Sequence, residues 1–175
     1  MSFARLAAAL GALAFACGIA AAAENAKPND AQIAHIAYTA GQLDIEAAEQ
    51  ALQKSSNKDI RAFATSMEQD HKAVNEKALA LVKKLGVTPE DNDTSKALAK
   101  QAADKRAELA KLSGAAFDRA YIDNEVAYHK AVNGALENLL IPSASNPELK
   151  DLLKTGLKIF EGHEQHAEHV AAEFK

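Results

Sequence analysis

Apolar residues recur every three or four positions along most of the chain, and short polar breaks separate these runs. This spacing is typical of amphipathic α-helices, which turn one apolar face towards a core. No run alternates with a period of two over a useful length, so we predict no β-strands. We expect helices over about residues 30–54, from the turn at 55–57 to 85, and over 95–112, 115–140 and 146–174.

The residues at the breaks support these boundaries. Asp30 can cap the first helix, and Gly86 followed by Pro89 is a typical C-terminal stop. We expect the fourth helix to end before Pro142, since the residue before a proline disfavours helical geometry. Asn146-Pro147 is a strong start signal for the last helix, because it places a capping side chain before a proline at the first helical position.

The lengths of the connections predict an all-α fold, a ferritin-like four-helix bundle. The segment 86–113 is too long for a hairpin link, whereas the other two connections between long helices are short. At about 1.5 Å per residue, its helical part could run most of the length of a bundle. We therefore expect two antiparallel hairpins joined by a long, partly helical crossover between the second and third long helices.

The first 23 residues are typical of a secretory signal. Arg5 precedes an apolar stretch too short to span a bilayer, and residues 21–23 form an Ala-x-Ala cleavage site. We therefore predict a signal peptide (1–23), a linker (24–29) and a bundle domain (30–175), and a periplasmic location. Cys17 lies in the leader, so the mature chain would have no cysteine for a disulfide or a thiolate site. A lipid anchor at Cys17 is the alternative, although the preceding residues 14–16 form a poor lipobox.

The charge balance excludes some partners. Removing Arg5 with the leader leaves 19 basic and 24 acidic residues, a formal charge of −5. An acidic domain lacks the basic surface that nucleic acid requires, so we expect no nucleic-acid partner. No segment after the leader is long and apolar enough for a membrane span. The sequence leaves open whether the chain forms a homo-oligomer.

Four histidines fall on the apolar stripes of three predicted helices. His71 continues the stripe of the second long helix, and His129 lies on that of the third. His163 and His166 follow the alternation of the last helix, which we read through 149, 152, 156, 159, 163, 166 and 170. Titratable side chains are rarely placed in an apolar seam without partners, so these four are candidate site residues.

Two carboxylates share these faces. Glu125 lies one turn before His129, and Asp44 lies within roughly 40° of the apolar stripe of the first helix. Counted along the helices from their connecting turns, most of these residues also fall at one depth near the middle of the bundle. We therefore predict a metal site formed by His71, His129, His163, His166, Glu125 and Asp44. Imidazole and carboxylate ligands suit Zn, Fe, Cu, Ni or Mn.

Other interpretations of the histidines stay open. A buried polar network needs only hydrogen-bond partners, and the chain would then be a structural or interaction protein of the cell envelope. A histidine cluster that titrates near pH 6.5 would make the protein pH-sensitive. A redox or oxygen-using enzyme would require two metal ions. The sequence assigns no reaction.

Several motifs in these helices match a known family. The stretches are Phe63-Ala64-x-x-Met67-x-x-Asp70-His71-x-x-x-Asn75, Leu112-Ser113-Gly114-x-x-Phe117-Asp118-x-x-Tyr121, Val126 with His129, and His163-x-x-His166-Ala167. Over about residues 29–174 the chain resembles an exported bacterial family of ferritin-like four-helix proteins of unknown function, often described as outer membrane proteins. The resemblance implies the ferritin-like fold and export but no activity. Diiron enzymes of this fold carry two Glu-x-x-His pairs, whereas the last helix here has His163-x-x-His166, which argues against ferroxidase or oxygenase chemistry.

Overall fold

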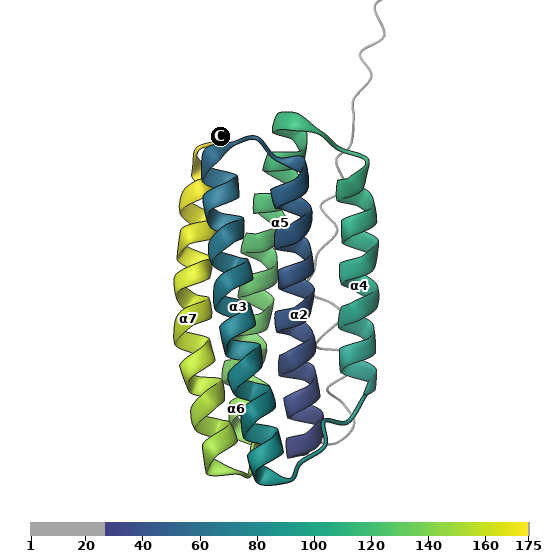
Figure 1. The fold of residues 1–175 in the computed structure, drawn as a ribbon, viewed down its shortest axis with the longest axis vertical. Coiled ribbons are helices and arrows are strands. Elements are labelled where there is room, and N and C mark those ends of the chain that lie inside the picture. Colours follow the sequence, from purple (N-terminus) through teal and green to yellow (C-terminus); the bar gives the residue numbers. More distant parts are fainter. Residues whose placement is uncertain (1–26, 175) are drawn as a thin grey trace, which may run out of the picture.

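The computed structural model describes residues 27–174, and all regular secondary structure in this part of the chain is helical (Figure 1). The expectation of an all-α chain without strands is confirmed for these residues. The expected signal peptide and Cys17 lie outside them. In chain order the elements are α2 (Asp30–Lys54), α3 (Lys58–Leu85), α4 (Asp93–Ala110), α5 (Gly114–Ala135), the π-helix η2 (Leu136–Leu140), α6 (Ile141–Ser143) and α7 (Pro147–Ala172).

The long helices α2, α3, α5 and α7 lie side by side with roughly parallel axes, and α4 packs along α2 (Figure 1). The most extensive packing is between α2 and α3 and between α5 and α7, so each of these pairs forms an antiparallel hairpin. Because α4 returns the chain along the length of the molecule, α3 and α5 run in the same direction (Figure 1). The long, partly helical connection expected between the second and third long helices is therefore present.

The start of α2 differs by one residue from the expectation, because Asn29 and not Asp30 is the N-cap. The Asn29 side chain accepts a hydrogen bond from the Gln32 N–H at 2.9 Å, and the Gln32 side chain accepts one from the Asn29 N–H at 3.1 Å. This reciprocal pair satisfies two N–H groups that a helix start leaves without partners. Asp30 instead accepts hydrogen bonds from the N–H groups of Ser145 and Asn146, at 2.8 and 2.9 Å, and so links α2 to the start of α7.

The expectation that the fourth predicted helix ends before Pro142 is wrong. After α5 the backbone widens into the π-helix η2 and continues through Pro142 into α6. Proline has no N–H to donate, and in a regular α-helix its ring would crowd the carbonyl of Asn138, four residues earlier. The wider turn accommodates the proline, and the Ile141 N–H donates to the Leu136 carbonyl oxygen.

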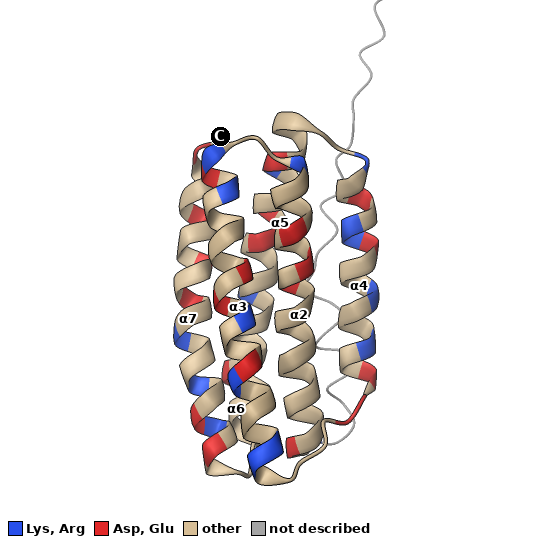
Figure 2. Cartoon of the chain, viewed as in Figure 1, with Lys and Arg blue, Asp and Glu red and all other residues tan. Residues whose placement is uncertain are grey.

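The interior has two halves of different character. Towards the end where the chain terminates, large rings and small alanines fill the space, among them Phe63, Phe117 and Tyr121, which are fully buried. Towards the other end, leucines and isoleucines from α2, η2 and α7 dominate. Residues 31–43 of α2 contain no charged side chain, and the lower part of this helix is correspondingly uncoloured in Figure 2. The candidate site lies where the two halves meet.

A candidate metal centre

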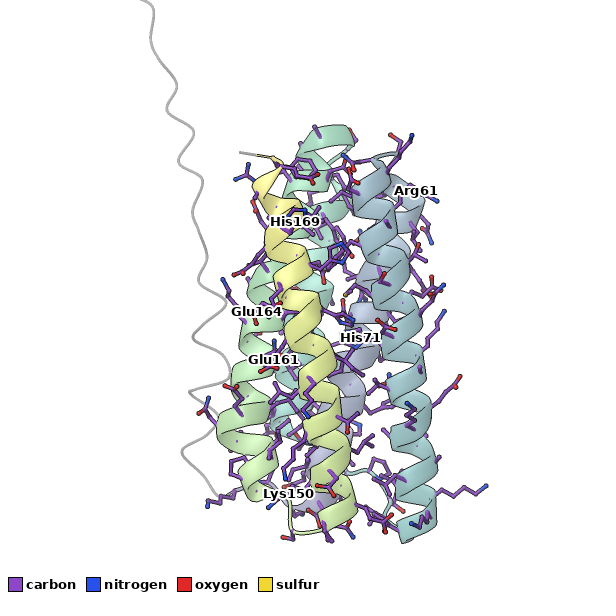
Figure 3. The ribbon with its side chains drawn as sticks, turned by 90° about the vertical axis from the view of Figure 1, so that its left-hand side faces the viewer. Arg61, His71, Lys150, Glu161, Glu164 and His169 are labelled. Carbon is purple, nitrogen blue, oxygen red and sulfur yellow. The ribbon has the colours of Figure 1, made fainter. Side chains whose placement is uncertain are left out.

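Three buried histidines from three helices meet in the interior. His71 comes from α3, His129 from α5 and His163 from α7, and their exposed fractions are 3, 1 and 6%. The ring centroids lie 5.3 to 5.9 Å apart. Figure 3 shows His71 pointing inward from α3. Helices that are far apart in sequence therefore bring together the three imidazoles that the apolar stripes had placed on interior faces.

Asp44 of α2 provides a carboxylate to this cluster. Its Oδ2 lies 2.6 Å from Nε2 of His71 and 3.5 Å from Nε2 of His129, and the side chain is fully buried. Burial by itself raises the pKa of Asp44, but the neighbouring imidazoles of His71 and His129 lower it by more, so the pKa lies below its ordinary value. Asp44 is therefore ionised at neutral pH.

The outer nitrogens of two histidines are fixed by hydrogen bonds. Nδ1 of His129 lies 3.0 Å from the backbone carbonyl oxygen of Glu125, and Nε2 of His163 lies 3.0 Å from Oδ2 of Asp70. Because a carbonyl or carboxylate oxygen can only accept, each of these nitrogens carries the proton in the neutral ring. The lone pairs are then on Nε2 of His129 and Nδ1 of His163. Both atoms are buried and have no hydrogen-bond partner among the described residues.

Burial keeps two of these histidines neutral. It lowers the pKa of His163 from 6.5 to about 4, although the hydrogen bond that His163 donates to Asp70 opposes this change and the other two imidazoles add to it. Burial also lowers the pKa of His129, against the attraction of Asp44. A neutral imidazole with a free lone pair is the form that binds a metal ion.

Glu125 provides a second carboxyl group beside Asp44 and His129. Its Oε2 lies 3.8 Å from Nδ1 of His129, and it is 1% exposed. Burial raises its pKa well above the ordinary value, and the negative charge of Asp44 raises it further. The pKa values of the two neighbouring carboxyl groups are therefore shifted in opposite directions, that of Asp44 downwards and that of Glu125 upwards.

His166 does not lie in the cluster, and its expected place on the buried face is wrong. The side chain is exposed, and its ring lies edge-on to Phe63 with centroids 5.2 Å apart. The buried stripe of α7 runs through Phe160, His163 and Ala167, and the face is therefore rotated away from His166. His169 is exposed as well, on the outside of α7 (Figure 3). Neither His166 nor His169 belongs to a group of three or more described residues whose donor atoms lie close together.

Two neighbours of the site were not singled out from the sequence. Asp70 is half exposed and holds His163, yet it belongs to α3 and precedes His71 by one residue. Phe160 stacks on His71 with a centroid distance of 4.5 Å and an angle of 11° between the rings. Its spacing of one turn before His163 could have indicated Phe160, whereas only the packing of α3 against α7 shows that Asp70 reaches His163.

The arrangement contains two groups that could hold a metal ion, and they share His129. One consists of His71, His129 and His163, and the other of Asp44, Glu125 and His129; within each group the donor atoms lie within 4.8 Å of one another. Nitrogen and oxygen donors of this kind suit a divalent transition metal. The role of these residues as ligands stays a prediction.

Within the part of the chain that the structure describes, no helix has the length and apolar character required to cross a membrane. Neither a curated protein nor a solved structure matches the chain. A family model does match, and it covers residues 16–170, a stretch that contains every residue of the cluster. The chain therefore belongs to the family described as "Domain of unknown function (DUF4142)".

Proposed function

We propose that this protein binds a divalent transition-metal ion in its interior, with His71, His129, His163 and Asp44 as ligands and Glu125 as a further ligand or neighbour. One observation carries the proposal. Two ring nitrogens of this buried cluster, Nε2 of His129 and Nδ1 of His163, have no hydrogen-bond partner among the described residues, and both residues belong to a group whose donor atoms lie within 4.8 Å of one another. Buried polar atoms nearly always have a partner, so two unpartnered ring nitrogens in one buried cluster indicate a ligand.

The donor set fits this proposal chemically. His129 and His163 are held by their outer nitrogens to an oxygen acceptor, and metal-binding histidines typically have such a partner. Asp44 supplies a negative charge that compensates the charge of an ion in a medium of low polarity. Zn, Fe, Cu, Ni and Mn all accept imidazole and carboxylate, so the donor set does not choose among them.

We further propose a setting for this site. The two antiparallel hairpins and the crossover α4 support a ferritin-like arrangement of α2, α3, α5 and α7. The leader-like residues 1–23 support export to the periplasm. The role that fits a buried ion in an exported protein is metal handling or protection of the envelope under stress.

A metal analysis of the tag-free protein tests the binding proposal, because an added histidine tag would itself bind metal. We expect the purified protein to retain metal after desalting, and added Zn, Fe, Cu or Mn to raise its melting temperature. His163→Ala should weaken binding at least about tenfold, whereas His169→Ala, an exposed histidine of the same helix, should leave it unchanged. The absence of bound metal together with no thermal shift for any of these ions would refute the proposal.

The close contact of Asp44 with His71 supports a second candidate, a structural protein whose histidines form a polar network. In that case an apolar residue of similar shape could replace a member at little cost. His71→Leu would then leave stability unchanged or raise it, and no ion would bind. If the wild-type protein binds metal and His71→Leu does not, the metal-site interpretation is correct.

A further inference from the structure

The leucine-rich half of the interior contains a cavity that ends at the histidine cluster. Its volume is about 70 Å³, and His71 and His129 form part of its wall. The rest of the wall comes from all the long helices and from η2, and it is mainly aliphatic. Phe160, which stacks on His71, also lines it. The cavity therefore touches the candidate site on the side opposite to the packed aromatic half.

Small side chains at interior positions create this space. Ala37, Ala40, Ala78 and Gly156 all line the cavity, and a larger apolar residue at any of the three alanine positions would extend into it. The other half of the interior also contains alanines, but fully buried phenylalanines and a tyrosine pack against them. Protein interiors are normally packed without voids larger than a water molecule, so a space of this size next to a candidate site is unusual.

The π-helix η2 is an independent feature of the same wall. Leu136, Leu139 and Leu140 line the cavity, and they lie in the segment where the backbone departs from the α-helix. Single π-helical turns inside helices occur frequently at functional sites. The local widening thus places three leucines around the cavity.

The chemistry of the wall defines the ligand. The lining contains no Lys, Arg, Asp or Glu, which excludes a charged molecule. The polar groups of the wall away from the cluster are largely engaged with backbone oxygens: the Tyr128 hydroxyl donates to Ala40 at 2.7 Å, and the Asn75 side chain donates to Tyr38 at 3.4 Å. Apolar cavities of this kind stay dry, and one of about 150 Å³ holds benzene or xenon. The cavity here has about half that volume, so it can hold only a molecule of a few heavy atoms.

We propose that this cavity binds a small uncharged apolar molecule, of the size of dioxygen or a short hydrocarbon, against the imidazoles of His71 and His129. Several lining residues are half-buried, among them Val74, Ala78 and Leu152, so small side-chain movements give such a molecule access from solvent. The proposal goes beyond metal binding and does not depend on it, because the cavity is formed by the protein alone.

Xenon is the probe, and NMR of the tag-free, metal-free full chain is the measurement. We expect saturable shifts of methyl signals from Leu136 and Leu153, and of the imidazole signals of His71 and His129. The imidazole signals of the exposed His166 and His169 should not move. Absence of a saturable response would refute the cavity as a binding site, and methyl shifts without shifts of the two buried imidazoles would refute its position beside the cluster.

Filling the cavity provides the matched test. Ala78→Leu adds three carbons at the wall, and it should abolish the saturable shifts. Ala80→Leu, two residues later on the exposed face of α3, should leave them intact. If Ala78→Leu does not fold, Ala37→Leu fills the cavity from α2. A wild-type response in a folded cavity-filling variant would overturn the proposal, whatever the result of the metal analysis.

Discussion

Replacing Asp44 by asparagine tests the reasoning about the cluster most directly. The substitution keeps the shape of the side chain and removes the ionised carboxylate that lies within 4 Å of two of the imidazoles. Because the Asp44 side chain has no exposed surface, water cannot solvate the neighbouring imidazoles in place of the lost carboxylate. Asp44→Asn should therefore destabilise the protein without metal and should also weaken metal binding.

The magnitude follows from the contacts. A hydrogen bond or close contact with a charged group contributes about 1.5–3 kcal/mol, and breaking a buried ion pair costs about 3–5 kcal/mol. Because asparagine keeps the shape of the side chain and can still accept a hydrogen bond, we expect a loss near the boundary of these ranges, about 3 kcal/mol. For a chain of this length, 1 kcal/mol corresponds to roughly 2–4 °C in melting temperature, so the expected decrease is about 6–12 °C.

The assay is thermal unfolding followed by circular dichroism, at pH 7.5, in a chelator and then with added zinc. The control is Glu49→Gln, the same chemical change at an exposed position of α2 whose ion pair with Lys72 contributes about 0–1 kcal/mol. A ligand at 100 times its Kd adds about 2.7 kcal/mol of stability, which Asp44→Asn should largely lose. A decrease of less than about 2 °C together with normal stabilisation by zinc would show that Asp44 neither supports the imidazoles nor binds the ion.

Three further predictions concern pH, packing and the support of His163. Because burial lowers the pKa of His163 from 6.5 to about 4, the unfolded chain binds more protons than the folded protein between these pH values. Urea unfolding of the metal-free protein should therefore show that stability falls by up to about 3 kcal/mol as the pH is lowered from 6.5 to 4. A gain in stability over this range would contradict the assignment. Gly41→Ala should destabilise the protein by about 1–3 kcal/mol in the same assay, since the new Cβ would lie 2.5 Å from Oδ1 of Asn75. The control Gly134→Ala places its Cβ where nothing lies within 4 Å, so it should stabilise the protein by about 0.5–1 kcal/mol. Asp70→Asn should weaken zinc binding roughly 10- to 100-fold in calorimetry with little change in fold, and an unchanged affinity would exclude a positioning role for Asp70.

Much of the helical structure could be predicted from the sequence because its signals are local. Gly86 adopts the left-handed conformation that ends α3, and Asn146 caps α7 with Pro147 at the first position, both as expected. Caps and stops depend on a few neighbouring residues, so no tertiary information is needed. Pro142 shows the limit of such rules, since a π-helical turn let the chain continue past a residue that usually ends a helix.

The candidate site depended on both levels. An apolar stripe locates a helical face only to within about one residue, and residues three or four apart differ by about 60° or 40° in direction. For His71 and His129 this precision sufficed, because the stripe on each side of them is regular. In α7 it did not: the neighbouring helices selected the face with Phe160, His163 and Ala167, and His166 became exposed.

The sequence by itself determined that the chain is helical, where most helices begin and end, and that buried histidines and carboxylates lie at similar depth. Only the tertiary structure decided which of them share one cluster, that Asp70 of α3 holds His163 of α7, and that a cavity reaches His71 and His129. The physical reason is that helix formation follows from interactions within a few residues. The rotation of each helix and the space left between side chains depend instead on packing against the side chains of other helices.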